Sequence, residues 1–178
     1  LVAAGLDVAE LTDHNKIPDI ADPISLAMGD DWSLLPVQGV EARIGPPEKV
    51  VGHYNVFPTT NDAEMPDMDS TAAGPHWLRW RRRQHASPHP ALDTKALIQL
   101  NHPRGVQVLP NQKDKADLGL FSATGFDPEV PLDREPNAWA SRPGALDVDL
   151  LEVYNRYSWS LYREVRADWF HLLDQGHY

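Results

Sequence analysis

Short apolar runs recur along this chain, separated by longer segments that proline interrupts. The runs contain residues typical of β-strands, and the segments between them are long enough to carry crossover helices. The runs are Leu6–Leu11, Leu34–Val37, Val50–Phe57, Ala96–Leu100 and Val148–Tyr154. Strands that alternate with such connections predict an α/β fold built on a mainly parallel sheet.

The C-terminal part of the chain has a different periodicity. Large apolar residues recur at Leu161, Val165 and Trp169 within the segment Ser158–Gln175, which is the spacing of one helix face. Gly176 follows and suits a helix C-terminus, where the left-handed backbone conformation is common. We therefore predict a helix over this segment.

Proline and glycine shape the remaining segments. We expect helices in the later half of 17–32 and over 77–84, and long loops over 58–75 and 104–143. Long loops that follow strand ends often lie over active sites, and the second of these loops follows a predicted strand.

Size and charge limit the classes of function. A chain of 178 residues fits a single domain, here 1–178, and can bury roughly 70% of its unfolded surface. Its net charge of −10 argues against nucleic acid or anionic membranes as partners, because both would be repelled. No run approaches the roughly 20 apolar residues that cross a bilayer, so we expect a soluble protein, either cytoplasmic or exported. The absence of cysteine leaves His, Asp and Glu as the side chains that would bind a metal.

Four residues of types that bind metals stand at or near the ends of separate apolar runs. They are His14, Glu41, His53 and His102. Parallel neighbouring strands would bring these positions to one end of the sheet, where α/β enzymes have their active sites. Together they predict a metal site.

Each residue also has a simpler interpretation when it is taken alone. Asp13 and Asn15, on either side of His14, suit a turn, because Asp and Asn side chains hydrogen-bond to the backbone at such positions. Glu41 closes an apolar stretch, where an ion pair with Arg43 would compensate its charge as well as a metal would. His53 suits a hydrogen-bonded position in the core. The metal interpretation therefore depends on the four residues converging.

The sequence around these residues resembles a known family. The segments that carry the resemblance are Gly5–Asn15, Gly39–Glu41, Gly52–Asn55, Gln99–Gly105 and Leu146–Asn155. They resemble the PHP (polymerase and histidinol phosphatase) superfamily, and look closest to its carbaryl-hydrolase-like branch, the CehA/McbA family. The resemblance implies a distorted (β/α)7 barrel, here a partial one with long loops, with two or three divalent metals at the carboxyl ends of its strands.

The resemblance also implies a set of metal ligands. His14, Glu41, His53 and His102 match the ligand positions of the family, with Glu41 as the bridging carboxylate. These donors suit Mn, Zn or Fe. Such ions lower the pKa of bound water and stabilise charge on the attacked oxygen, so the resemblance predicts a metal-dependent hydrolase. Its small-molecule substrate would be a phosphoester, or a carbamate or other ester.

Further residues match other positions of the family. Asp13 and Arg104 are catalytic candidates, with Arg104 as a group that would orient an anionic substrate. Asn101 is a candidate for a supporting or a substrate-facing role. Glu152 and Asn155 match a recurrent family pattern to which we assign no role.

Two motifs of the family are missing from the chain. The family opens with a strand that carries His-x-His and closes with one that carries Asp-x-His, and this chain contains neither. We expect the chain to be a fragment truncated at both ends, with these motifs in the flanking sequence. The alternative is a non-catalytic module that keeps the fold and binds a metal or another ligand without turnover.

Overall fold

A computed structural model describes residues 8–18, 35–43, 52–59, 80, 95–108, 116–140, 146–154 and 159–177. The helices predicted within 17–32 and 77–84 and the loop predicted over 58–75 fall mostly outside these ranges. Only residues 17–18, 58–59 and Trp80 of them are described, and Trp80 is helical and fully buried.

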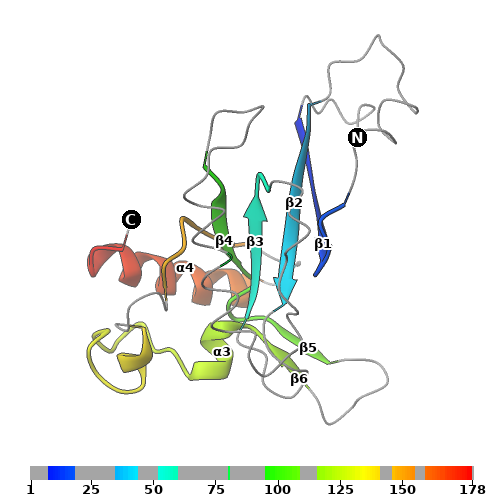
Figure 1. The fold of residues 1–178 in the computed structure, drawn as a ribbon. Helices are drawn as coiled ribbons and strands as arrows, with labels where there is room; N and C mark the ends of the chain where they lie inside the picture. The colour runs from blue at the N-terminus through cyan, green and yellow to red at the C-terminus, as the bar shows by residue number, and fades with distance from the viewer. Residues whose placement is uncertain are drawn as a thin grey trace.

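Five strands form one open sheet in the described part of the chain (Figure 1). They are β1 (Val8–His14), β2 (Leu35–Arg43), β3 (His53–Phe57), β4 (Leu97–Asn101) and β7 (Leu150–Leu151). Their order across the sheet is β1-β2-β3-β4-β7, so β1 and β7 are its edges. Each strand overlaps one of the predicted runs, and together with the helices described below they confirm the α/β class.

The sheet is mixed, so the prediction of a mainly parallel sheet was wrong. β1 pairs with β2 and β4 with β7 in parallel, whereas β3 is antiparallel to both β2 and β4. The connection from Arg43 to His53 is shorter than the dozen or so residues that a parallel crossover needs. β3 therefore returns beside β2 in the opposite direction.

One face of the sheet is apolar. Side chains alternate along a strand, so residues that are registered opposite one another share a face. On this face lie Val40, Ala42, Tyr54, Val56, Ile98 and Leu100, all buried in one cluster. Trp80, Phe121 and Leu172 belong to the same cluster, so segments distant in sequence complete the core.

The opposite face of the sheet is polar towards the end where β1 and β2 finish, and it carries apolar residues such as Val8, Leu35 and Leu97 at the other end. The register places on it Glu10, Thr12, His14, Glu41, Arg43, His53, Asn55, Gln99 and Asn101. Gly39 lies among them, and a Cβ added there would lie 2.8 Å from Thr12 Cγ2 and 2.9 Å from Glu10 Oε1. Side chains of β1 therefore lean across the glycine. The alternation of the strand sequences thus gathers the metal-binding residue types on one side.

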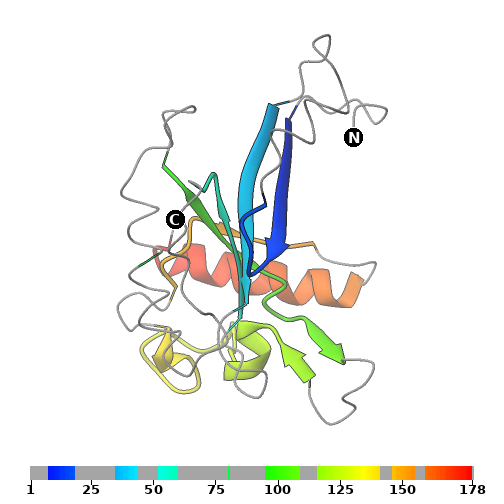
Figure 2. The ribbon, with the colours of Figure 1, turned by 45° about the vertical axis from the view of Figure 1, so that its right-hand side comes forward.

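The loop predicted over 104–143 contains regular structure. β5 (Val106–Val108) and β6 (Ala116–Leu118) form an antiparallel hairpin, α3 (Leu120–Thr124) follows, and the 3-10 helix η2 spans Asn137–Trp139. Figure 2 shows the hairpin and α3 at the end of the sheet towards which β1 and β2 point. The loop prediction was wrong over these elements, which are too short to show a periodicity.

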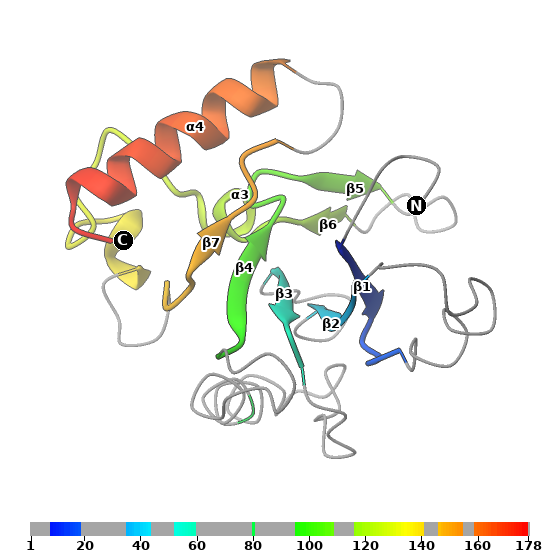
Figure 3. The same ribbon diagram turned by 90° about the horizontal axis from the view of Figure 1, so that it is seen from above.

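The C-terminal helix α4 (Trp159–Asp174) confirms the helix predicted from spacing. Val165 and Leu172 are buried, and Asp168, on the turn between them, is also fully buried. Gly176 follows with a φ of +86°, the conformation expected at this position. Seen from above in Figure 3, α4 lies beside the β7 end of the sheet. No helix in the described ranges is both long and apolar enough to span a membrane.

Candidate metal centre

The four predicted ligands lie at one end of the sheet. His14 is the last residue of β1, Glu41 lies near the end of β2, and His102 directly follows β4. His53 is instead the first residue of β3. Since β3 runs in the opposite direction, its start lies at the same end of the sheet. The antiparallel strand therefore completes a set that the sequence analysis expected from parallel strands.

Glu41 is the centre of this group, which we call the His–Glu cluster. Its Oε1 lies 3.0 Å from His53 Nδ1 and 3.3 Å from His102 Nε2, and its Oε2 lies 3.9 Å from His14 Nδ1. The ring centroids of His14 and His53 are 5.8 Å apart, and those of His53 and His102 are 4.7 Å apart. Three imidazoles thus surround one carboxylate.

The cluster is buried on one side and open on the other. The side chain of His53 is 3% exposed and that of Glu41 17%, whereas His14 is 67% exposed. His53 is therefore a buried, hydrogen-bonded histidine, as its simpler interpretation held, and also a member of the cluster. His14 is therefore the most exposed residue of the cluster.

The donor atoms are close enough to share a cation. One donor atom from each of His14, Glu41 and His53 lies within 4.8 Å of the other two. Ligands about 2.0–2.2 Å from a single transition-metal ion lie at most about 4.4 Å apart, so small side-chain shifts would bring these atoms to one ion. Imidazole nitrogen and carboxylate oxygen are donors that such ions accept. The residues present therefore fit a divalent metal.

The surroundings of Glu41 decide its protonation state. Burial by itself would raise the pKa of its carboxyl group. Hydrogen bonds from His102 and His53 oppose this effect. The charge of His14 and a hydrogen bond from Asn101 add to them, and the pKa of Glu41 is held well below its usual range. Glu41 is therefore ionised at neutral pH, the state in which a carboxylate binds a cation.

A row of amide side chains adjoins Glu41 on the polar face. Asn101 Nδ2 donates to Asn55 Oδ1 at 2.7 Å, and Asn101 Oδ1 accepts from Gln99 Nε2 at 2.9 Å. Asn101 is 4% exposed. Because its own partners lie on β3 and β4, they orient the amide that bonds to Glu41. Asn101 thus has the supporting place expected of it, whereas Asn55 and Gln99 were missed. Their spacing of two residues from His53 and Asn101 was the available signal.

The turn after β1 ties that strand to β2. Asn15 has a φ of +53°, and its N–H donates to the carbonyl oxygen of Glu41 at 2.9 Å. Its Oδ1 accepts the backbone N–H of Arg43 at 2.8 Å. The turn and the metal interpretations of His14 are compatible, because His14 ends β1 directly before this turn. The bond from the Arg43 N–H to Asn15 Oδ1 is the side-chain contact with the backbone that the turn interpretation predicts.

Asp13 lies on the other face of the sheet from the His–Glu cluster. It is registered opposite Val40, whereas His14 is registered opposite Glu41. Its side chain is exposed. The structure therefore does not bring this catalytic candidate together with the four predicted ligands.

The turn that carries His102 is strained and closely enclosed. His102 has a φ of +28°, a region that costs a non-glycine residue about 1–2 kcal/mol. Its N–H donates to Glu152 Oε2 at 2.6 Å, and its carbonyl accepts the N–H of Gly105 at 2.7 Å. Gly119 passes so near that a Cβ there would overlap the His102 carbonyl oxygen. Glu152, which had no role from the sequence, is therefore one of the contacts that hold this turn. Asn155 lies outside the described residues.

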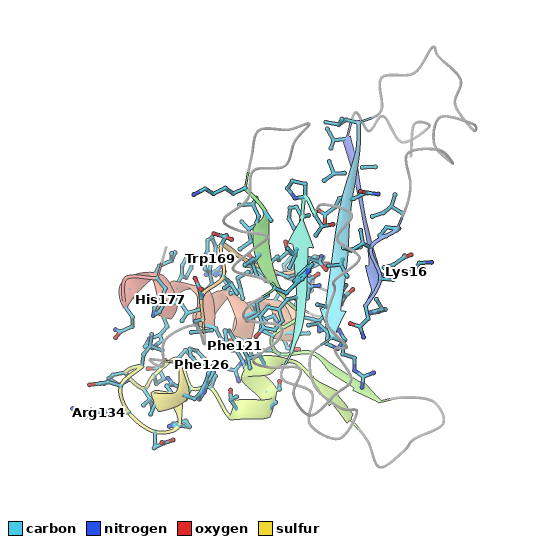
Figure 4. All side chains as sticks on the ribbon, viewed as in Figure 1. Lys16, Phe121, Phe126, Arg134, Trp169 and His177 are labelled. Carbon is cyan, nitrogen blue, oxygen red and sulfur yellow. The ribbon has the colours of Figure 1, made fainter. Side chains whose placement is uncertain are left out.

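The guanidinium of Arg104 bonds to α4 and lies against two aromatic rings. Its Nε and Nη2 donate to the two carboxylate oxygens of Asp168, each at 2.7 Å, and Nη2 also donates to the carbonyl of Phe126 at 2.6 Å. The guanidinium lies over the rings of Phe121 and Phe126, which Figure 4 labels. Burial raises the pKa of Asp168, and the bonds from Arg104 oppose that effect. This engagement favours a structural role for Arg104.

Comparison with known proteins identifies no relative of the chain. No family model, curated protein or solved structure matches it. A statement about function therefore depends on the geometry of the site and on the resemblance seen in the sequence.

Proposed function

We propose that this chain carries part of the active site of a metal-dependent hydrolase of the PHP type, in a distorted (β/α)7 barrel. The observation that supports the proposal best is the ionised Glu41 surrounded by His14, His53 and His102. A lone carboxylate on a half-buried face needs one compensating charge, whereas here three potential ligands converge on it. Bound Mn, Zn or Fe would supply Lewis acidity and a water of lowered pKa.

The exposure of each residue in the His–Glu cluster suggests its role in binding the metal. Glu41 and the buried His53 would hold the ion from below, and His102 would hold it from the end of β4. Exposed His14 lies at the open side, where a substrate would approach. Asn101 keeps the carboxylate oriented through its own amide partners. The order of exposure makes His53 an anchor and His14 the ligand nearest to the substrate.

The substrate we propose is a small phosphoester, or a carbamate or other ester. Orientation of an anionic group by Arg104 stays a prediction, and the contacts of its guanidinium with Asp168 do not favour it. The amide side chains beside the cluster, Asn55, Gln99 and Asn101, offer hydrogen bonds, which suit either class of substrate.

Metal binding is the first test of the proposal. We expect the chain to retain Mn²⁺, Zn²⁺ or Fe²⁺ after desalting, measured by elemental analysis, and we expect His53→Ala and His102→Ala to lower affinity at least about tenfold. His177→Ala is the matched control, because His177 lies beyond α4 and outside the cluster. Equal metal content in the unaltered chain and in all three variants would contradict the proposed metal site.

Turnover is the second test. The metal-loaded chain would be assayed with p-nitrophenyl phosphate and with a p-nitrophenyl carbamate. Hydrolysis of either that His53→Ala abolishes would support the proposal and select the substrate class. Metal binding without hydrolysis of either substrate would favour the non-catalytic module instead.

A further inference from the structure

Two acidic side chains flank the short strand β7 and extend its pairing with β4. Asp149 N–H donates to the carbonyl of Ile98 at 2.8 Å, and Asp149 Oδ2 accepts the N–H of Ile98 at 2.8 Å. Glu152 N–H donates to the carbonyl of Leu100 at 2.9 Å, and Glu152 Oε2 accepts the N–H of His102 at 2.6 Å. Each carboxylate thus takes an acceptor position that a longer β7 would fill with a carbonyl.

The two carboxylates meet different backbone. Ile98 lies inside β4 in ordinary strand conformation, whereas His102 lies past its end with a φ of +28°. A strained conformation persists only where its surroundings hold it, and hydrogen bonds to a charged acceptor are stronger than those to a carbonyl. At this backbone angle the imidazole of His102 reaches Glu41, with Nε2 at 3.3 Å from Oε1.

We infer that Glu152 is a positioning residue of the metal centre, because its carboxylate holds the His102 backbone in the conformation that directs the imidazole towards Glu41. The inference rests on the proposed function, since positioning of His102 matters to a metal only if His102 binds one. Glu152 acts through the backbone of His102 and needs no contact of its own with the ion.

The test compares three variants of the full chain by titration with Co²⁺, whose visible absorption reports the number and geometry of its ligands. Glu152→Ala removes the acceptor, Glu152→Gln keeps an acceptor oxygen in place, and Asp149→Ala removes the equivalent carboxylate from the other end of β7. We expect Glu152→Ala to weaken Co²⁺ binding about tenfold or more and to change the spectrum. Glu152→Gln should recover most of the affinity, and Asp149→Ala should stay within about twofold of the unaltered chain.

A second measurement separates the contact from its consequence. In the metal-free chain, hydrogen exchange at the His102 amide should become faster in Glu152→Ala and stay slow in Asp149→Ala. If the unaltered chain binds no Co²⁺, the proposed function fails and the inference falls with it, whatever the exchange rates show. If it binds Co²⁺ and Glu152→Ala changes neither affinity nor spectrum, the inference alone is overturned. Equal losses in Glu152→Ala and Asp149→Ala would also overturn it, because both would then act by loosening β7.

Discussion

His102 and Arg104 are two residues apart on one turn, yet they belong to polar groups of opposite design. Arg104 pairs with Asp168 through two hydrogen bonds of 2.7 Å, so one cation is matched by one anion, and the guanidinium lies over an aromatic ring. His102 joins a cluster in which three imidazoles meet the single carboxylate of Glu41. The first group is matched in charge and geometry, whereas the second has more donors than its one anion requires.

This difference between the two groups distinguishes a contact that stabilises the fold from one that can bind a ligand. In a bidentate ion pair the two side chains already satisfy each other, so they are not available to a ligand. The Arg104–Asp168 pair connects the turn after β4 to α4. A carboxylate with several imidazoles around it can exchange their hydrogen bonds for a shared cation. We therefore assign the Arg104 pair to stability and the His–Glu cluster to binding.

The largest expected effect breaks the ion pair. Arg104→Ala leaves Asp168 buried without its partner, and such a loss typically costs about 3–5 kcal/mol in the free energy of unfolding. Urea denaturation would measure it, with exposed Arg134→Ala as a control expected to change stability by less than about 0.5 kcal/mol. A stable Arg104→Ala protein with impaired substrate binding would restore the substrate role and end the contrast between the two groups.

Two glycines test how closely the His102 turn is enclosed. Gly119 has an ordinary φ of −58°, but a Cβ there would overlap backbone atoms of His102 and Pro103. Gly125 has a φ of +68°, with no atom within 4 Å of an added Cβ. We expect Gly119→Ala to cost about 3 kcal/mol by steric overlap and to lower metal affinity. Gly125→Ala should cost about 1 kcal/mol and leave metal binding unchanged, by the same urea and metal titrations. The reverse order would contradict the enclosure.

A third prediction sharpens the electrostatic side of the comparison. The pKa of Glu41 is lowered in the folded state, so its contribution to stability is present above its unfolded pKa of 4.5 and is lost as pH falls further. Glu41→Gln should therefore cost about 2 kcal/mol in the metal-free chain at pH 7, and clearly less at pH 3. Urea unfolding at both pH values measures this difference, and a cost that does not depend on pH would show that the imidazoles do not hold Glu41 ionised.

The sequence predicted the members of the His–Glu cluster better than the topology that assembles them. Residue type and position at strand ends were enough to select His14, Glu41, His53 and His102. The direction of β3 was missed, although the short connection from Arg43 to His53 excludes a parallel crossover. The prediction of the cluster was still correct, because the start of one strand and the end of its neighbour lie at the same end of the sheet when the strands run in opposite directions.

Partners of distant residues could not be predicted at all. Asp168 lies on α4, 64 residues after Arg104, and its place on that helix carries no mark of a buried charge. Glu152 likewise accepts a bond from a residue 50 positions earlier. Such contacts depend on how the helix and the edge strand dock, which periodicity within each element does not specify.

The smallest expected effect concerns a second carboxylate on the same polar face. Glu10 lies on β1, where its carboxyl leans over Gly39 beside Thr12, and desolvation there raises its pKa from an ordinary 4.5 to about 7. Val37 on β2 is registered opposite Glu10, whereas His14 on β1 is registered opposite Glu41. Because the folded pKa is the higher one, the stabilising contribution of Glu10 is complete below pH 4.5 and is lost as pH rises through 7.

Glu10→Gln should therefore match the unaltered chain at pH 4.5 and exceed its stability at pH 8.5. Glu10 is exposed, so solvent screening limits the gain to about 1 kcal/mol. Exposed Glu135→Gln serves as the control and should change stability by less than about 0.5 kcal/mol at both pH values. Equal stability of Glu10→Gln and the unaltered chain at pH 8.5 would mean that the polar face is hydrated as far as Gly39. The low pKa of Glu41 would then owe less to its imidazoles, because little burial would be left for them to oppose.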